Sequence, residues 1–337
     1  MNSDRVREGS KLTAAEAEGG RGIGRAHGKA ILLGEHTVVH GTPAIAFPLP
    51  ALSAHAVAHR DRPDVSWEGD SPAGQYFRFA AGGIRTAERA SSGAHVAVEE
   101  ALRRWGLAGE VVEVALDCEI PPARGLGSSA ACAAAAVRAA ADLYDRSIDS
   151  GILYELVQCG EQFAHGRASG VDASTAVATG PIWFRAGAAR GLAIGLDATL
   201  VIADTGVPGA TQHAVAAVRR KLESDRRAAQ RVLEHATDLV ESAAADLAAG
   251  HAESLGKTLL EFQELLAELG VSTPEIDALV TAAHDAGAYG AKLTGGGLGG
   301  CVVALTDTGD DAARVRAALS RAGAARTWIV PTRDGQP

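Results

Sequence analysis

One segment in the first half of the chain constrains the fold most strongly. An alternating apolar and polar strand, residues 111–120, runs into PPARGLGSS and then into an alanine-rich helix over about residues 129–144. Gly125 and Gly127 allow a sharp turn and let a ligand approach the backbone with no Cβ in the way. The alanines let the helix pack closely against a sheet. The segment therefore predicts mixed helix and sheet, with a ligand-binding loop where the helix begins.

The start of this helix is suited to an anion. Its free backbone N–H groups and the helix dipole attract a group such as phosphate. Ser128 and Ser129 stand where they could cap the helix, and a serine hydroxyl there could also bind Mg²⁺. Taken alone, the segment is equally compatible with a plain glycine turn and a serine cap. It also fits the dinucleotide pattern G-x-G-x-x-A, but the two prolines and the lack of a suitably spaced acid weaken that interpretation.

A second glycine-rich segment lies near the C-terminal end. GGGLGG, residues 295–300, precedes a predicted strand at 301–305, where a dinucleotide motif would need a helix. Five glycines in six residues cost conformational entropy. Close approach of the backbone to something else explains them best, either to the first glycine loop or to a bound phosphate.

Polar residues also surround the first predicted strand, residues 30–34. GKAILLGEHTVVHG places Lys29, Glu35, His36 and His40 around it. Each of these is more often structural than functional when taken singly. Together they bring a cation, a carboxylate and imidazoles into one short stretch, which suits an anionic, hydroxylated substrate.

Two acidic residues follow in the middle of the chain. Glu161 falls in a helix predicted over 152–164, and Asp172 in a segment, HGRASGVDAS, that we expect to be a loop. An isolated acid is normally a solvated charge. An acid on a glycine-shaped loop is nevertheless a candidate general base, and the Glu161 carboxylate would suit a hard cation such as Mg²⁺.

The chain is long enough for two lobes. Its 337 residues exceed the usual limit of one hydrophobic core. We expect a disordered tail over 1–24, an N-terminal ATP-binding lobe over 25–190 and a C-terminal α+β lobe over 191–337, divided near the glycine-rich stretch 186–197. The pattern is helical almost throughout 209–287, with breaks near Gly250, Gly270 and Pro274, and returns to strand, helix and strand at the end.

Composition excludes several classes of partner. A net charge of −9 and an aromatic content of 4% argue against nucleic-acid binding. No window is apolar enough for a membrane span, and the polar N-terminal stretch has no secretory core. The four cysteines form no C-x-x-C pair, so we expect reduced thiols and a cytoplasmic protein.

These four segments, in this order over residues 25–306, resemble the GHMP small-molecule kinases. PPARGLGSSAA matches the family's ATP-phosphate motif, and KLTGGGLGGC matches its C-terminal glycine motif. GKAILLGEHTVVHG and GEQFAHGRASGVD are similar to the branch that phosphorylates mevalonate. Galactokinases share G-E-H-T but normally continue with Asp-Tyr, whereas Val38 and Val39 follow here. The resemblance implies an α+β fold of two lobes, with the active site in the cleft between them.

The resemblance also implies an activity. It is the ATP-dependent transfer of a phosphoryl group to the C5 hydroxyl of mevalonate, a step in isoprenoid precursor synthesis, with Mg²⁺ as cofactor and a homodimer as the assembly. Asp172 would be the base, Lys29 would stabilise the alkoxide and the phosphoryl group, and Glu161 and Ser129 would bind Mg²⁺. The other implied positions are the substrate-side residues Glu35 and His36 and the phosphate-binding residues Gly125, Leu126, Gly127, Ser128, Ser129, Gly295, Gly296 and Gly297.

Alternatives within and outside the family stay open at this point. A sister kinase could act on phosphomevalonate, a sugar or homoserine, and phosphomevalonate would demand additional Lys or Arg residues for its extra charge. A ligand sensor without activity could use the same fold, although Asp172, Lys29 and Glu161 are all present. One departure from the family is Arg124, which stands where a small residue is usual and would either reach a phosphate or point to solvent.

Overall fold

The computed structural model describes residues 20–60, 75–82, 92–166 and 168–333. Most of the expected N-terminal tail lies outside these residues. Strand β1 begins at Arg21, however, so the expected tail boundary at residue 24 is wrong: residues 21–24 belong to the first strand. They pair with the end of β2, which supplies the hydrogen bonds that a tail would lack.

The first sheet is antiparallel and carries the N-terminal half of the site. Its order is β3-β4-β2-β5-β6, and β1 pairs with β2. The apolar run 44–48 and the loosely alternating run 52–59 predict two short strands, but the two runs form one long strand, with a shift of register opposite His27 and Gly28. Its strands are β1 (Arg21–Leu33), β2 (Ala44–Arg60), β3 (Gln75–Gly82), β4 (Val111–Cys118), β5 (Ile182–Arg185) and β6 (Ala188–Gly191).

Helix α2 (Ser128–Leu143) packs directly on β1, as the alanine-rich sequence predicts. A Cβ at Gly22 would lie 2.1 Å from the backbone oxygen of Ala139, and one at Gly24 would lie 2.0 Å from that of Ala135. Helix and strand therefore meet backbone to backbone. This close packing fixes the start of α2, and with it the first glycine loop, relative to the sheet.

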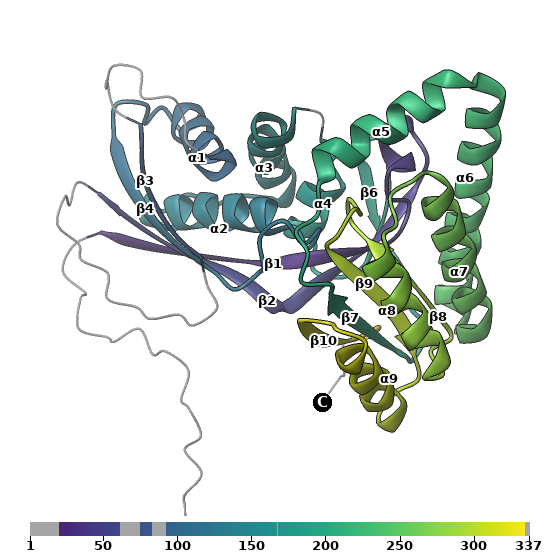
Figure 1. Cartoon of the computed structure of the whole chain (residues 1–337). Coiled ribbons are helices and arrows are strands. Elements are labelled where there is room, and N and C mark those ends of the chain that lie inside the picture. Colours follow the sequence, from purple (N-terminus) through teal and green to yellow (C-terminus); the bar gives the residue numbers. More distant parts are fainter. Residues whose placement is uncertain (1–19, 61–74, 83–91, 167, 334–337) are drawn as a thin grey trace, which may run out of the picture.

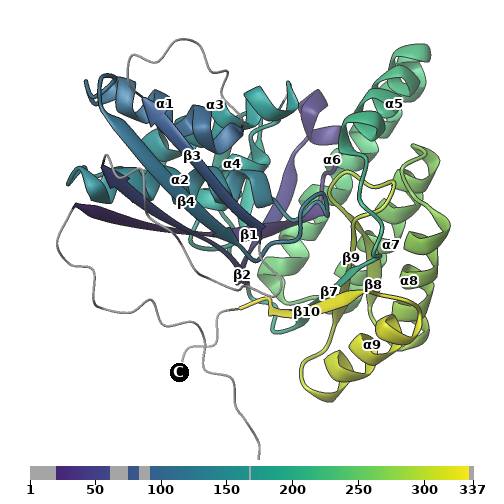
Figure 2. The same cartoon turned by 60° about the vertical axis from the view of Figure 1, so that its left-hand side comes forward.

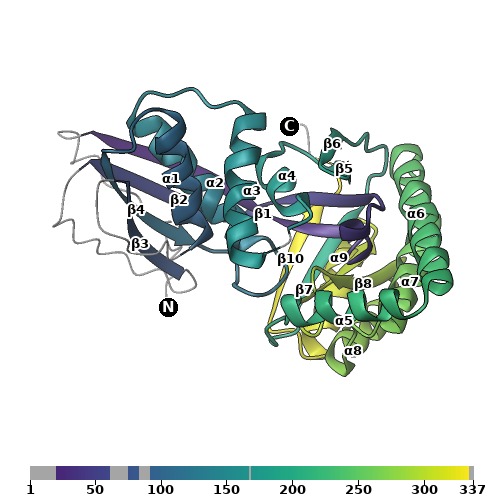
Figure 3. The same ribbon diagram turned by 90° about the horizontal axis from the view of Figure 1, so that it is seen from above.

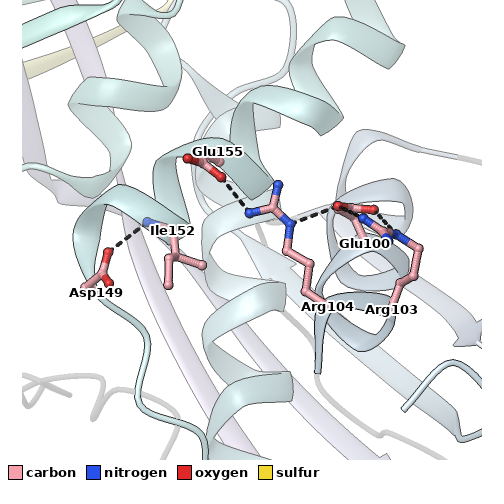
Figure 4. A network of polar contacts seen from close by, with 6 residues as sticks. All are labelled: Glu100, Arg103, Arg104, Asp149, Ile152 and Glu155. Atoms are coloured by element: carbon pink, nitrogen blue, oxygen red, sulfur yellow. Dashed lines mark hydrogen bonds and ion pairs between the residues drawn. The ribbon is translucent and has the colours of Figure 1, made fainter. Parts of the chain in front are cut away.

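Further helices cover α2 on its outer side (Figure 1). Arg104 of α1 donates a hydrogen bond of 2.6 Å to Glu155 of α3, and Glu100 accepts another from Arg104 (Figure 4). Asp149 caps α3 by accepting from the backbone N–H of Ile152. These contacts hold α3, which carries Glu161. The helices are α1 (Gly93–Arg104), α3 (Ser150–His165) and α4 (Val171–Val177), and the 3-10 turn η1 (Thr37–His40) follows β1.

The second sheet has the order β10-β7-β9-β8 and lies beside the first (Figures 1 and 2). The helical stretch expected over 209–287 is four helices, with one break, at Asp225, that the sequence analysis missed. The end of β1 and η1 reach α6 (Figure 3). The elements are β7 (Thr199–Asp204), α5 (Thr211–Ser224), α6 (Arg226–Ala249), α7 (Ala252–Glu268), α8 (Pro274–Asp285), β8 (Gly290–Thr294), β9 (Cys301–Thr306), α9 (Asp310–Arg321) and β10 (Arg326–Pro331).

Two predictions about composition can be compared with the structure. Cys118, Cys132, Cys159 and Cys301 are all free thiols, as expected. In the described part of the chain, no helix is both long enough and apolar enough to cross a membrane.

Candidate active site

A cavity of about 140 Å³ opens where the two glycine loops meet the end of β1. Its wall is made by strand β1, the 3-10 turn η1, helices α3, α4 and α5, and the two glycine loops. Its lining brings together most of the residues that the sequence singled out: Lys29, Ile31, Glu35, His36, Val38, Val39, Gly125, Gln158, Glu161, His165, Ala168, Ser169, Gly170, Asp172, Thr211, Val215, Gly295 and Gly296.

Lys29 and Asp172 form an ion pair in this cavity. The Lys29 Nζ lies 2.7 Å from the Asp172 Oδ1, and the two side chains are 3% and 38% exposed. The backbone of the lysine is also fixed, because its N–H donates to the Leu126 carbonyl at 2.9 Å. Its stem crosses Gly127, where a Cβ would lie 2.8 Å from the Lys29 Cγ. The first glycine loop therefore holds the lysine in place.

The expectation that Asp172 lies in a loop is wrong. The residue lies in the first turn of the short helix α4, which begins after Gly170 in a left-handed conformation. Helix α4 has only seven residues, which is too short for a helical period to be recognised in the sequence. The helix gives the carboxyl group a more rigid support than a loop would.

Glu161 lies nearly buried on α3 beside this pair. Burial raises the pKa of its carboxyl group, the negative charge of Asp172 raises it further, and Ser129 and Lys29 oppose the shift. The Glu161 Oε1 has no hydrogen-bond partner among the described residues. A buried, unpaired carboxylate oxygen between a second carboxylate and a serine hydroxyl is suited to a cation.

This donor set is too small to enclose a metal ion by itself. The described residues contain no group of three or more His, Cys, Asp or Glu side chains that could hold one. Mg²⁺ commonly binds to one or two carboxylates together with phosphate oxygens and water. Glu161 and Ser129 therefore fit Mg²⁺ that arrives with a nucleotide.

The two glycine loops touch each other. A Cβ at Gly295 would lie only 2.6 Å from the Gly125 Cα, and both residues have positive φ. The second loop therefore approaches the first loop closely, one of the two explanations left open by the sequence. The expected serine cap is wrong, because Gly127 is the N-cap of α2 and no side chain caps the helix. The first N–H groups of α2 consequently have no intrahelical partner or side-chain cap.

Of the eight predicted phosphate-binding residues, three line the cavity and five do not, namely Leu126, Gly127, Ser128, Ser129 and Gly297. Gly125, Gly295 and Gly296 line the cavity. Leu126 is buried in the core, and Gly297 packs against the Val271 carbonyl. The latter residues shape the loops and do not face the cavity.

Glu35 and His36 both line the cavity, and each also contacts the C-terminal half of the chain. The Glu35 Oε1 lies 2.5 Å from the Nζ of Lys292, a lysine buried in β8. The His36 Nε2 bonds to the Gly296 carbonyl at 3.0 Å. Burial lowers the pKa of His36 to about 4, so the ring is neutral near pH 7. Because a carbonyl can only accept, Nε2 carries the proton and Nδ1 is an acceptor.

Three functional or supporting residues were not predicted from the sequence: Gln158 in the cavity wall, and Lys292 and Thr294, which contact the lining residues Glu35 and Ile31. Gln158 precedes Glu161 by one helical turn, and its buried Oε1 has no partner among the described residues. Lys292 was detectable as a single charge inside a short apolar segment before the glycines. Thr294 bonds to both the N–H and the carbonyl of Ile31 through its hydroxyl, a contact for which the sequence carries no signal.

Comparison with known proteins identifies the class. Residues 92–180 match the GHMP kinases N terminal domain, and residues 243–325 match GHMP kinases C terminal. The chain belongs to the GHMP kinase family. A mevalonate kinase of Aeropyrum pernix is 33% identical over 85% of this chain and 88% of the relative, and one of Pyrococcus abyssi is 32% identical over 84% and 88%.

Solved structures agree with this assignment. The mevalonate kinase of L. major, in complex with R-mevalonate, is 25% identical, covers 94% of this chain and 97% of its own, and has a TM-score of 0.74. A mevalonate kinase from methicillin-resistant Staphylococcus aureus is 29% identical over 92% and 98%, with a TM-score of 0.65. The α+β fold expected from the sequence is confirmed.

Proposed function

We propose that the protein transfers the γ-phosphoryl group of ATP to the C5 hydroxyl of mevalonate, a step in isoprenoid precursor synthesis. The observation that carries the proposal is the Lys29–Asp172 ion pair, 2.7 Å long, in a cavity beside the two touching glycine loops. As a GHMP kinase, the chain uses ATP as its phosphoryl donor. Its relatives at more than 30% identity are mevalonate kinases, which supports mevalonate as the acceptor.

In this proposal, Asp172 accepts the proton of the C5 hydroxyl as its oxygen attacks the γ-phosphorus and ADP leaves. The partly exposed carboxyl group can reach a hydroxyl in the cavity, as a general base must. Lys29 neutralises the negative charge that develops on the attacking oxygen and on the phosphoryl group. Phosphoryl transfer depends mainly on such positioning and charge neutralisation.

The proposal assigns the cation to Ser129 and Glu161. The unpaired Oε1 of Glu161 and the neighbouring hydroxyl are oxygen donors of the kind that Mg²⁺ prefers. Mg²⁺ bound there with ATP would neutralise charge on the phosphate oxygens. The N–H groups at the start of α2 would receive phosphate oxygens from the other side.

The rest of the cavity suits an acceptor that donates hydrogen bonds. The Glu35 Oε2, the His36 Nδ1 and the Gln158 Oε1 are buried acceptors, and none has a partner among the described residues. Buried polar atoms are normally satisfied. Hydroxyl groups of a bound substrate would supply the missing donors, which supports a hydroxylated acceptor.

Charge distinguishes mevalonate from its phosphorylated form. Among the cavity-lining residues that the structure describes, Lys29 is the one Lys or Arg, and Asp172 already pairs with it. Phosphomevalonate carries two further negative charges and would need more cations. The cavity therefore favours mevalonate over phosphomevalonate.

An ADP-release assay with ATP and Mg²⁺ tests the proposal. Mevalonate, phosphomevalonate, galactose and homoserine would be compared as acceptors, and we expect the highest kcat/KM for mevalonate. The proposal fails if another acceptor is preferred. Release of no ADP with any of them would instead favour a ligand sensor on the same fold.

We also propose that the chain forms two lobes that divide near residue 190, the first beginning with β1 at Arg21, and that it assembles into a cytoplasmic homodimer. Strand β6 ends the first sheet at Gly191, and Gly195 and Leu196 already bond to Leu247 of α6. These contacts support the division near residue 190. Light scattering after size exclusion measures the assembly directly, and a monomer at micromolar concentration would contradict the dimer.

A further inference from the structure

Arg124 neither reaches into the cavity nor points to solvent. Its Nε lies 2.8 Å from the Oδ1 and 3.0 Å from the Oδ2 of Asp204, at the end of β7. Its Nη2 donates to the Gly206 carbonyl at 3.1 Å. The side chains of Arg124 and Asp204 are only 16% and 6% exposed. The arginine therefore joins the first glycine loop to the second sheet.

The residues around Arg124 are anchored to the same side. The Ala123 carbonyl accepts from the Gly209 N–H at 2.7 Å, and Gly125 rests on Gly295. Three consecutive residues, 123–125, thus contact the C-terminal half of the chain. The next residue, Leu126, instead accepts from the Lys29 N–H in β1. The loop consequently spans the two lobes, and the Arg124–Asp204 pair is its one charged anchor among the contacts described here.

We propose that Arg124 is a positioning residue for the phosphates of ATP. It holds the backbone of Gly125–Ser129 at the place where the nucleotide phosphates bind, and it acts through that backbone, since Asp204 already neutralises its charge. The inference rests on the proposed function in one respect: it assumes that the ATP phosphates bind at this loop. It extends that function by making the affinity for ATP depend on a contact between the lobes.

The geometry needs an arginine at this position. A guanidinium group donates in two directions within one plane, which matches a carboxylate on one side and the Gly206 carbonyl on the other. A lysine keeps the charge but cannot reproduce this arrangement. A residue without charge leaves the nearly buried Asp204 carboxylate with the Gly206 N–H as a hydrogen-bond donor but without this cation, so that β7 and the loop would separate or rearrange.

The test measures ATP binding without any acceptor. Calorimetric titration of the full chain with Mg·ATP would compare wild type with Arg124→Lys, Arg124→Met and Asp204→Asn. We expect the Kd for ATP to rise about tenfold in Arg124→Met, which corresponds to the loss of about one hydrogen bond between the displaced loop and a charged phosphate. Arg124→Lys should fall between this variant and wild type. The doubly substituted Arg124→Met/Asp204→Asn chain should lose little more than Arg124→Met alone, because both changes break one contact.

Steady-state kinetics separates positioning from general destabilisation. In Arg124→Met we expect KM for ATP to rise while KM for mevalonate stays within about twofold of wild type. Arg104→Met, which breaks the Arg104–Glu155 pair between α1 and α3 away from the loop, serves as the control. It should lower Tm without changing either KM.

The outcomes keep the two proposals apart. An unchanged Kd for ATP in Arg124→Met and Asp204→Asn, measured on folded protein, overturns the positioning role even if mevalonate is phosphorylated normally. Failure of wild type to phosphorylate mevalonate overturns the proposed function but leaves the ATP titration valid. If Arg124→Met does not fold, Arg124→Lys and Asp204→Asn decide the question.

Discussion

At the scale of single residues, the two members of the Lys29–Asp172 pair lie in different surroundings. The lysine is almost fully buried and held by the first glycine loop, whereas more than a third of the aspartate is exposed to the cavity. A base must meet its substrate, and a cation that stabilises charge must stay fixed before the reaction starts. The difference in exposure therefore agrees with the two proposed roles.

Replacing the proposed base tests this directly. We expect Asp172→Asn to lower kcat by about 10²–10⁴-fold, because the amide has the same shape but cannot accept the proton. Tm should change little, since the carboxyl group is partly exposed. The measurement is the coupled ADP assay on purified protein, alongside thermal unfolding. Near-normal turnover of mevalonate by this variant would remove Asp172 from the mechanism.

His36 gives a prediction for stability against pH. Burial lowers its pKa to about 4 in the folded protein, against 6.5 for a histidine side chain free in water. The unfolded chain therefore binds the proton first, and stability is lost as pH falls from about 6.5 to 4, by up to about 3 kcal/mol. Urea unfolding at several pH values should show this loss in wild type and a smaller one in His36→Asn. Equal losses in the two proteins would contradict the assignment.

Residues with a local signature could be predicted from the sequence, and residues defined by a distant partner could not. Lys29, Glu161 and Asp172 stand in short motifs and meet in one cavity. The contacts of Glu35 with Lys292 and of Arg124 with Asp204 join residues 257 and 80 positions apart. No local pattern encodes such pairs, because they exist only after the two sheets have formed.

At the scale of elements, the two glycine loops act as one unit. Gly125 and Gly106 have the same φ of 74°, but a Cβ at Gly125 would lie 2.9 Å from the Thr294 carbonyl oxygen, while one at Gly106 would meet nothing within 4 Å. Alanine at either position is strained by the positive φ. Only at Gly125 would it also push the loops apart.

This pair of glycines provides a matched experiment. We expect Gly106→Ala to lose about 1 kcal/mol of unfolding free energy and to keep its activity. Gly125→Ala should lose more stability and raise KM for ATP several-fold, because the phosphate loop must move. Denaturant unfolding and steady-state kinetics of both variants give the comparison. Identical behaviour of the two would show that contact between the loops is unimportant.

Long elements with a clear period were predicted well, and so was the short apolar strand at 301–305, which is β9, but the short strand β8 was missed. The alternating strand at 111–120 and the alanine-rich helix after it are β4 and α2. Strand β8, with five buried residues that include Lys292, has no alternation and was not assigned as a strand. Strand β2 was predicted as two strands, 44–48 and 52–59, whereas it continues through Pro48 and Pro50 with a shift of register against β1.

At the scale of the whole molecule, a buried ion pair joins the lobes. Lys292 of β8 contacts Glu35 after β1, and its ammonium group lies 5.6 Å from the centre of the Phe262 ring. Burial raises the pKa of Glu35 and lowers that of Lys292, and their mutual attraction opposes both shifts. Such a pair adds little net stability, but breaking it leaves a buried charge.

We therefore expect Lys292→Met to cost about 3–5 kcal/mol of unfolding free energy at pH 7. The deficit relative to wild type should shrink as pH falls from 7 to 5, because Glu35 can then take up a proton in the folded state. Urea unfolding at both pH values measures it. A companion Glu35→Gln/Lys292→Met chain, which has no charge at this place, should recover part of the loss. No recovery would mean that packing of the lysine stem matters more than its charge.

The position of β7 in the second sheet has a consequence for the order in which the protein becomes active. Strand β7, residues 199–204, lies between β9 and β10, which span 301–306 and 326–331. On the ribosome, both neighbours of β7 are therefore made about a hundred residues after it. The first sheet is complete by residue 191. The first glycine loop, however, also contacts Asp204 of β7 and Gly295, and these come together only after β8, β9 and β10 have been made. A nascent chain thus completes its first lobe long before it can hold a nucleotide.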